Sequence, residues 1–213
     1  VAWEEGWITS VKPRQERAES IGIIGAGPGG LSAAHMLRAR GFQVTVYDRY
    51  DRAGGLMTYG IPGFKLEKDV VLRRNQWLAD SGVEFVLNCT VGQDISFDAI
   101  RGKHDAVLIA TGVYKTRDLD IDNADAGGVV RAIDYLTASN KVDFGDDVPD
   151  FADGELDARG KRVVVIGGGD TAMDCVRTAV RQGAASVTCM YRRDKANMPG
   201  SMREVANAEE EGV

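Results

Sequence analysis

The chain has 213 residues, of which 44% are hydrophobic and 27% charged, enough for one large or two small globular domains. Its formal net charge of −6 argues against nucleic acid as a partner, because phosphate backbones bind basic surfaces. No apolar run is long enough to cross a bilayer, and the three separated cysteines form neither a disulfide framework nor a CxxC motif. We therefore expect a cytoplasmic protein without membrane attachment.

The ends of the chain suggest a piece of a longer protein. Residues 1–19 form a polar arm with no readable function. The chain starts at Val1 without an initiator methionine and stops at Val213, where a strand is expected to begin. We expect a fragment.

Residues 20–48 read as a strand, a glycine-rich turn, a helix and a second strand. The turn is Gly25-Ala26-Gly27-Pro28-Gly29-Gly30. In this pattern Gly25 permits a tight bend, Gly27 lets the backbone approach a pyrophosphate, and Gly30 lets the helix pack closely on the strand. The helix N-terminus attracts phosphates, and Asp48 at the end of the second strand would accept a hydrogen bond from a ribose hydroxyl. The stretch predicts a dinucleotide-binding fold.

A glycine-dense loop over residues 49–63 follows the acid. Loops of this length inside α/β domains are usually functional, and this one would lie along an extended dinucleotide. A flexible surface loop is the alternative. Beyond it the pattern predicts a helix from Leu66 to Ser81 and a strand from Val83 to Leu87.

A further buried strand, Asp105 to Ile109, runs into Ala110-Thr111-Gly112. Small residues at the carboxyl end of a strand suit close approach by a ligand at the crevice of an open parallel sheet. Residues 116–160 are polar, with seven acids and no base between Asp143 and Asp157, and we expect them to form an acidic connecting segment. The first domain would then occupy residues 20–115.

The opening pattern returns in residues 161–213. A strand from Arg162 to Ile166 leads into a GxGxxA turn, Gly167-Gly168-Gly169-Asp170-Thr171-Ala172, and then an amphipathic helix. The next strand ends on Arg192 and Arg193, where the first repeat ends on an acid. Guanidinium groups can pair with a 2′-phosphate, which an acid would repel, so this second site is expected to prefer NADP to NAD. Two solvated surface arginines are the alternative.

No residues of the chain form an arrangement that we predict to be catalytic or metal-binding. Two dinucleotide sites of different specificity suggest hydride transfer between two cofactors, in which the protein aligns the reactive atoms and excludes water. A non-catalytic dinucleotide-binding module is an alternative from another class. An enzyme like thioredoxin reductase is disfavoured because it would need a redox cysteine pair.

The motifs together resemble the small (β) subunit family of NADPH-dependent glutamate synthases, and also the related flavin/NADPH portion of dihydropyrimidine dehydrogenase. The resemblance rests on the two glycine turns with their flanks and on Trp3-Glu4-Glu5-Gly6-Trp7, Gly54-Gly55-Leu56-Met57-Thr58-Tyr59-Gly60-Ile61-Pro62, Ala110-Thr111-Gly112, Tyr191-Arg192-Arg193 and Asn197-Met198-Pro199-Gly200-Ser201. It implies an α/β protein with two Rossmann-like (GxGxxG/A) folds of the FAD/NAD(P)-binding type, each a parallel sheet flanked by helices.

The resemblance also implies the cofactors and the residues that bind them: FAD in the first fold and NADPH in the second, which is inserted into the first. The FAD set is Gly25, Ala26, Gly27, Pro28, Gly29, Gly30, Asp48, Arg49, Gly54, Gly55, Leu56, Ile61, Pro62, Ala110, Thr111 and Gly112. The NADPH set is Gly167, Gly168, Gly169, Asp170, Thr171, Arg192 and Arg193.

The activity implied is electron input: NADPH reduces FAD, and electrons pass through iron–sulfur clusters to the glutamate synthase large (alpha) subunit. That subunit makes L-glutamate from 2-oxoglutarate and glutamine-derived ammonia. The family's cysteine-rich region tied to the clusters is absent from these 213 residues, so clusters are expected only outside this chain. A related NADPH-dependent flavoprotein that feeds another acceptor is a further alternative.

Overall fold

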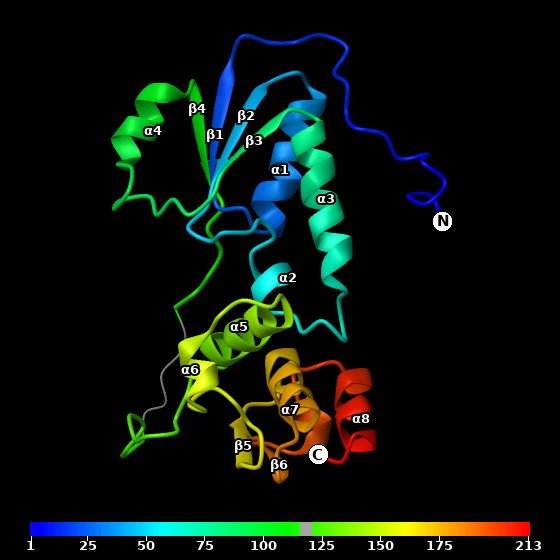
Figure 1. The fold of residues 1–213 in the computed structure, drawn as a ribbon, viewed down its shortest axis with the longest axis vertical. Coiled ribbons are helices and arrows are strands. Elements are labelled where there is room, and N and C mark those ends of the chain that lie inside the picture. The colour runs from blue at the N-terminus through cyan, green and yellow to red at the C-terminus, as the bar shows by residue number, and fades with distance from the viewer. Residues whose placement is uncertain (116–120) are drawn as a thin grey trace. The chain divides into compact units, whose positions relative to one another are not determined.

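A computed structural model describes residues 1–115 and 121–213 (Figure 1). The chain divides into two compact units. The first unit comprises Val1–Thr58 and Leu66–Val113, and the second comprises Tyr59–Lys65 and Tyr114–Val213. In the described ranges, no helix has both the length and the apolar character needed to cross a membrane.

The first unit is built on a four-stranded parallel sheet. Its strands are β1 (Ser20–Ile24), β2 (Gln43–Tyr47), β3 (Val83–Val86) and β4 (Ala106–Ile109), in the spatial order β3-β2-β1-β4. The chain runs outward from β1 to β3 and then returns to the other side of β1. Ligands of open α/β sheets bind at such a reversal, outside the carboxyl ends of the strands. The topology therefore marks the carboxyl ends of β1 and β4 as the candidate site.

Helices cover both faces of this sheet (Figure 1). On one face α1 (Pro28–Ala39) and α3 (Lys68–Asp80) pack over a core that includes Ile23, Val46 and Leu78, each with 0% exposure. On the other face α4 (Phe97–Lys103) places Ile100 against β1 and β2. Burial on both faces is typical of parallel sheets. These elements confirm the predicted α/β class, although the sequence analysis did not predict α4.

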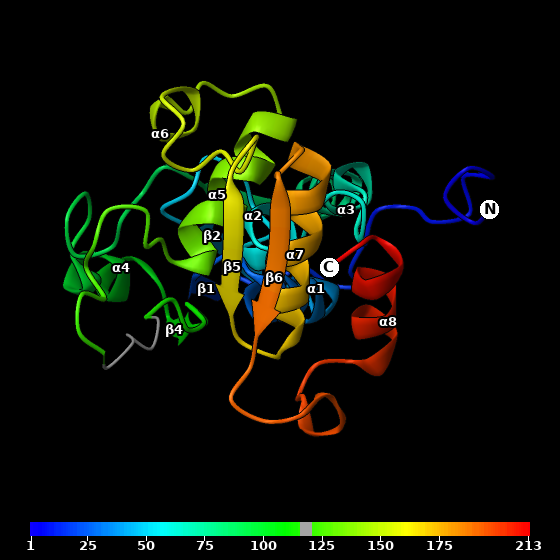
Figure 2. The same ribbon diagram turned by 90° about the horizontal axis from the view of Figure 1, so that it is seen from below.

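The second unit holds a parallel strand pair and several helices. The elements are α5 (Ala132–Asp143), α6 (Pro149–Ala152), β5 (Arg162–Ile166), α7 (Asp170–Gln182), β6 (Ser186–Met190), the 3-10 helix η1 (Lys195–Asn197) and α8 (Met202–Glu210). Helix α7 packs along one face of the β5–β6 pair (Figure 2). The apolar stripe of this amphipathic helix is buried at Ala172, Met173, Val176 and Ala179 as predicted, but the polar residues between them are buried as well, which the pattern did not predict.

The structure differs from the expected connecting segment over residues 116–160. Residues 116–120 lie outside the described residues, but the described remainder belongs to the second unit. Helix α5 inserts Tyr135 and Leu136 into a cluster with Cys175 and Ala179 of α7. The acids dominate the composition of this stretch, yet two large apolar side chains on one face are enough to fasten the helix by hydrophobic burial.

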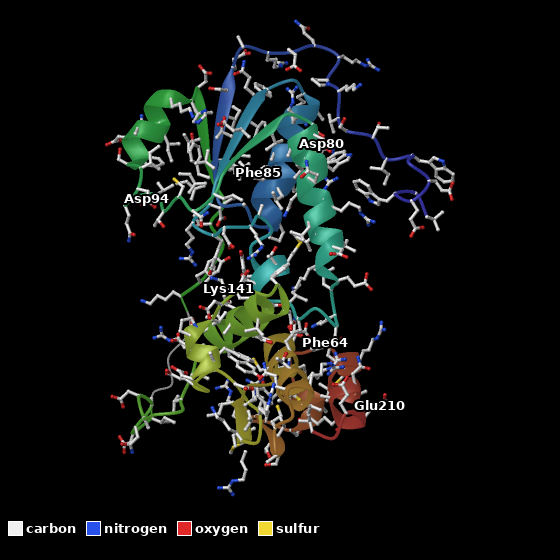
Figure 3. All side chains as sticks on the ribbon, in the orientation of Figure 1. Phe64, Asp80, Phe85, Asp94, Lys141 and Glu210 are labelled. Carbon is white, nitrogen blue, oxygen red and sulfur yellow. The ribbon has the colours of Figure 1, made fainter. Side chains whose placement is uncertain are left out.

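The short stretch Tyr59–Lys65 also belongs to the second unit, although it lies between two parts of the first in the sequence. Asn140 donates a hydrogen bond of 3.1 Å to the Tyr59 carbonyl, and the Lys65 ammonium lies 2.7 Å from the Asp174 carboxylate. The guanidinium carbon of Arg181 lies 3.8 Å from the centroid of the Phe64 ring. Figure 3 labels Phe64. These contacts link residues more than 80 positions apart in sequence.

A charged network joins α7 to α8. The guanidinium groups of Arg177 and Arg181 lie 2.8 and 2.6 Å from the carboxylate of Glu211, and Arg177 also lies 2.7 Å from Glu204. Hydrogen bonds from Arg181 and Arg177 lower the pKa of Glu211 to about 2. Bidentate pairs between arginine and carboxylate are the stronger class of ion pair. The network therefore contributes stability wherever Glu211 is ionised.

We expect Glu211→Gln to lower the free energy of unfolding at pH 7 by about 1–2 kcal/mol, an amount reduced by the 23% exposure of the Glu211 side chain. Because the folded pKa is depressed, this contribution is fully present above the usual glutamate pKa of 4.5 and is lost as pH falls toward 2. Denaturation followed by far-UV circular dichroism at pH 7, 4.5 and 3 measures it.

Tryptophan fluorescence supplies the control for this variant. Trp3, Trp7 and Trp77 all belong to the first unit, so their unfolding transition should be unchanged in Glu211→Gln. If the difference in free energy of unfolding between the wild type and Glu211→Gln were as large at pH 3 as at pH 7, the stabilisation could not come from the charge of Glu211.

Candidate functional site

The turn after β1 is bent tightly at Gly25. This residue has φ +110°, a conformation that side chains disfavour, and a Cβ built on it would lie 2.5 Å from the Ala110 carbonyl oxygen. Its N–H donates to the Tyr47 carbonyl at 2.8 Å. The Ala110 N–H donates to the Ile24 carbonyl at 2.8 Å. The glycine turn and the predicted Ala110-Thr111-Gly112 motif therefore meet at the β1/β4 reversal.

Gly30 determines how closely α1 approaches the turn. A Cβ on Gly30 would lie 1.9 Å from the Gly25 carbonyl oxygen, so only glycine fits without a shift of the helix. Gly27 and Gly29 face open space, and Gly27 is the N-cap of α1 without a side-chain cap. Backbone groups at the positive end of the helix dipole are thus exposed beside Gly27, and Pro28 at the helix start has no N–H to satisfy. This geometry suits an anion that approaches the backbone closely.

Asp48 reaches this turn from the end of β2. Its Oδ2 accepts a 2.6 Å hydrogen bond from the Ala26 N–H, and its Oδ1 accepts a 2.9 Å bond from the Tyr50 N–H. Each carboxylate oxygen has a second acceptor position. The neighbouring Arg49 is exposed, and its guanidinium carbon lies 4.9 Å from the centre of the Tyr50 ring. The structure therefore brings the predicted acid to the predicted turn.

The first part of the glycine-dense loop is fastened to the same turn. Gly54, with φ +121°, donates its N–H to the Ala26 carbonyl at 2.8 Å. The Thr58 hydroxyl and the Asn75 amide both donate to the Ala53 carbonyl at 2.8 Å. Thr58 has 0% exposure. The loop is thus a packed segment rather than the flexible surface loop that composition also allowed.

The remaining loop positions divide between the two units. Gly55 is buried and has φ +54°, and Leu56, 38% exposed, begins the short helix α2 (Leu56–Tyr59). Ile61 and Pro62 belong to the second unit, where Pro62 is buried. Within the first unit, hydrogen bonds and close contacts bring together these positions predicted for FAD: Gly25, Ala26, Gly30, Asp48, Gly54, Ala110 and Thr111.

The glycine turn of the second unit repeats this arrangement with differences. Gly167 donates its N–H to the Met190 carbonyl at 2.9 Å, and Gly169 is the N-cap of α7 and faces open space. Asp170 and Thr171 are exposed in the first turn of that helix. Gly168 is covered: a Cβ there would lie 2.8 Å from the Tyr191 ring. Arg192 and Arg193 follow Tyr191 and are exposed.

Two residues near this turn were not predicted as site residues. The Gly200 N–H donates to the Gly168 carbonyl at 3.0 Å, and the Ser201 N–H donates to Asp170 Oδ1 at 2.8 Å. The Pro-Gly pair that precedes Ser201 signals a turn in the sequence, but a turn signal does not say which distant backbone the turn contacts. Only the folded chain shows that residues 200 and 201 lie against the glycine turn.

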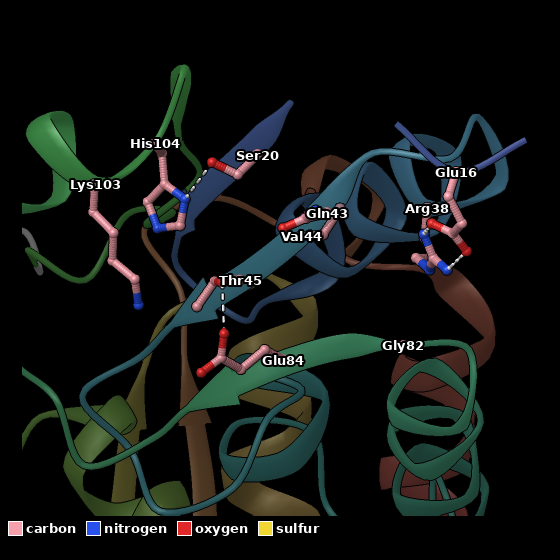
Figure 4. Close-up of a pocket in the computed structure, with 10 residues that line it drawn as sticks. All are labelled: Glu16, Ser20, Arg38, Gln43, Val44, Thr45, Gly82, Glu84, Lys103 and His104. Carbon is pink, nitrogen blue, oxygen red and sulfur yellow. Dashed lines mark hydrogen bonds and ion pairs between the residues drawn. The ribbon is translucent and has the colours of Figure 1, made fainter. Parts of the chain in front are cut away.

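A pocket of about 440 Å³ lies elsewhere in the first unit, at the amino ends of its strands (Figure 4). His104 is buried here, with Nε2 2.9 Å from the Tyr47 hydroxyl and Nδ1 3.3 Å from the Ser20 hydroxyl. Burial, reinforced by the nearby Lys103 charge, lowers the pKa of His104. None of the residues predicted to bind a cofactor lines this pocket.

Comparison with known proteins gives a family match over almost the whole chain. Residues 19–213 match the family described as "Pyridine nucleotide-disulphide oxidoreductase". The chain is 74% identical to a protein named putative glutamate synthase [NADPH] small chain from Cereibacter sphaeroides, and 62% identical to the glutamate synthase [NADPH] small chain of Azospirillum brasilense. Both matches cover 100% of this chain, and 51% and 44% of the respective relatives.

A further relative and a solved structure are also similar to this chain. It is 47% identical over 98% of its length to the putative oxidoreductase UacF of Escherichia coli, and it covers 32% of that protein. Among solved structures, Mycobacterium tuberculosis FprA in complex with NADPH has a TM-score of 0.75 at 23% identity, over 92% of this chain and 48% of FprA. The FprA likeness shows the fold. The chain spans about half the length of the small chains it matches.

The contact between Gly30 and Gly25 gives a matched pair of variants. We expect Gly30→Ala to destabilise the first unit by about 1–3 kcal/mol, because the added methyl group must displace α1 from the turn. Gly29→Ala adds the same methyl group one residue earlier, into open space, and should change stability by less than about 0.5 kcal/mol. Urea denaturation followed by tryptophan fluorescence compares the two, and equal effects would contradict this account.

Proposed function

Because the chain belongs to the pyridine nucleotide-disulphide oxidoreductase family, we propose that it forms FAD- and NADPH-binding parts of the electron-input subunit of glutamate synthase. Its activity would be hydride transfer from NADPH to FAD. Electrons would then pass through iron–sulfur clusters outside this chain to the large (alpha) subunit, which makes L-glutamate from 2-oxoglutarate and glutamine. The observation that carries this proposal is full-chain identity of 74% and 62% to glutamate synthase [NADPH] small chains.

The first glycine turn fits the adenosine diphosphate part of FAD. The open space at Gly27 gives a pyrophosphate access to the start of α1, while the tight contact of Gly30 with Gly25 holds that helix start in place. Asp48 already lies at the turn, with an acceptor position left on each oxygen for a ribose hydroxyl. Ala110 and Thr111 border the same turn at the end of β4, and Gly112 follows them in the chain. These residues would hold FAD.

The second glycine turn fits a dinucleotide in the same way. A Cβ on Gly169 would have no atom within 4 Å, so the N-cap of α7 leaves space for a phosphate, and Thr171 is exposed in the first turn of that helix. The proposed ligand is NADPH because the strand after this turn ends on two exposed arginines rather than on an acid. Guanidinium groups make charge-assisted hydrogen bonds to phosphate. Arg192 and Arg193 would therefore distinguish a nucleotide that carries a 2′-phosphate.

If both cofactors were bound at these turns, the chemistry supplied would be hydride donation by NADPH and hydride acceptance by FAD. The chain's own residues bind and orient the nucleotides through backbone groups, and no side chain needs to act as a general acid or base. The carboxylate of Asp48 fixes a ribose, and the arginines fix a phosphate. We therefore propose the glycine turns and their flanking charges, rather than a catalytic side chain, as the functional residues.

A second candidate function is a related NADPH-dependent flavoprotein that serves a different acceptor. The 47% identity to UacF, named a putative oxidoreductase, favours it. The higher identities to two small chains favour glutamate synthase. The two candidates share both cofactor sites and differ only in the acceptor. Electron transfer from NADPH to the glutamate synthase large subunit therefore separates them.

The primary test is anaerobic reduction of the flavin in the full-length protein. We expect bound FAD to lose its visible absorption on addition of NADPH at least tenfold faster than on addition of the same concentration of NADH. A protein that binds both cofactors but never bleaches would instead be a non-catalytic binding module. Glutamate formation that depends on NADPH, after the large subunit is added with 2-oxoglutarate and glutamine, would identify the acceptor.

The arginine pair is tested by charge reversal. We expect Arg192→Asp together with Arg193→Asp to abolish the NADPH preference, because two carboxylates would repel the 2′-phosphate. NADH should be used about as well as before, since it lacks that phosphate. The ratio of kcat/KM values for the two nucleotides measures this effect. Persistence of the wild-type ratio would assign the arginines to the solvated surface.

A further inference from the structure

The two arginines lie on a loop whose ends both contact the second glycine turn. At the start of the loop, the Tyr191 ring lies against Gly168, 2.8 Å from the position of an added Cβ. At its end, the Gly200 N–H donates to the carbonyl of that same glycine at 3.0 Å. Arg192 and Arg193 follow Tyr191 directly. Residues 191–200 therefore form a loop that is attached to the turn at both ends, and we call this loop the strap.

The strap is also fastened internally. The Asp194 carboxylate accepts a 3.0 Å hydrogen bond from the Asn197 N–H, which caps η1, and the Tyr191 hydroxyl donates to the Asn197 carbonyl at 3.4 Å. The approach at Gly200 is close, because a Cβ there would lie 3.1 Å from the Gly169 carbonyl carbon. The backbone that carries the arginines is thus held at a fixed distance from the turn.

Asp170 closes this strap on the helix side. Its Oδ1 accepts the Ser201 N–H at 2.8 Å, and Asp170 is the first residue of α7. A carboxylate at this position is stabilised by the helix dipole but would repel a pyrophosphate that approaches the same helix end. The geometry gives the carboxylate another partner, a backbone N–H some thirty residues further along the chain.

We propose that Asp170 is a positioning residue, which acts through Ser201 to hold Arg192 and Arg193 at the distance that a 2′-phosphate requires. The inference rests on the proposed NADPH site. In a nucleotide the separation of the pyrophosphate and the 2′-phosphate is set by one ribose, so the turn and the arginines must keep a matching separation. A detached strap would leave the arginines intact but mobile, and each would then lose side-chain entropy on binding.

The chain offers a matched pair of variants at Ser201. Ser201→Pro removes the N–H that Asp170 accepts, and the φ of −59° at this position is one that proline adopts. Ser201→Ala keeps the N–H, and the Ser201 side chain makes no capping hydrogen bond to α8, so alanine loses nothing there. At the other partner, Asp170→Ala removes the acceptor, whereas Asp170→Asn keeps an acceptor oxygen.

The measurement is equilibrium binding of 2′,5′-ADP and of 5′-AMP to the full-length protein by calorimetry. These probes differ only in the 2′-phosphate. We expect Ser201→Pro to weaken 2′,5′-ADP binding about tenfold and 5′-AMP binding less than twofold. Asp170→Ala also removes a negative charge that acts on both probes, so for this variant we expect a change of about tenfold in the ratio of the two dissociation constants, against 2′,5′-ADP. Ser201→Ala and Asp170→Asn should keep the wild-type ratio of the two dissociation constants. The double variant Arg192→Ala with Arg193→Ala gives the ratio expected when both arginine contacts to the 2′-phosphate are lost.

Each other outcome has a definite meaning. An unchanged ratio in Asp170→Ala would overturn the proposal, and it would do so even if Ser201→Pro failed to fold. An equal loss for both probes would also overturn it, because the strap would then support the turn and not the arginines. A wild-type protein that binds the two probes equally would instead refute the proposed NADPH site, before the variants are considered.

Discussion

The contact between Gly30 and the carbonyl oxygen of Gly25 is the constraint on which the first unit depends. A side chain at position 30 would collide with that oxygen at 1.9 Å, so the start of α1 lies directly on the end of β1. This places the positive end of the helix dipole at the β1/β4 reversal. The carboxylate of Asp48 and the N–H of Gly54 then reach the same turn through hydrogen bonds to Ala26.

The second unit uses the same turn, but one of its three defining positions is alanine instead of glycine. Ala172 occupies the position of the third glycine, and its Cβ lies 3.3 Å from the position of a Cβ added to Gly167. Gly168 lies against the Tyr191 ring, and Gly200 approaches the start of α7, so residues of the strap pack around this turn. In the first unit, the residues that pack on Gly25 are Ala110 and Thr111 at the end of β4. Two related turns can thus serve nucleotides that differ in one phosphate, because the flanking charges differ.

The stretch Tyr59–Lys65 makes contacts with α7 that its own sequence pattern does not indicate. In the sequence it continues a glycine-dense loop that belongs, up to Thr58, to the first unit. In the fold, Lys65 pairs with Asp174, a buried acid on α7, and Phe64 lies beneath Arg181. Burial raises the pKa of Asp174, and the Lys65 ammonium opposes that effect. An unpaired carboxylate with 6% exposure would be costly, so this pair fixes the stretch to the second unit.

The sequence by itself determined the α/β class, both glycine turns and the strands that lead into them, because glycine spacing and hydrophobic period are local properties. Only the tertiary structure decided that α5 belongs to the second unit, that His104 is buried, and that Ser201 donates to Asp170. These facts depend on contacts between residues distant in sequence, and no local pattern encodes which distant partner a residue meets.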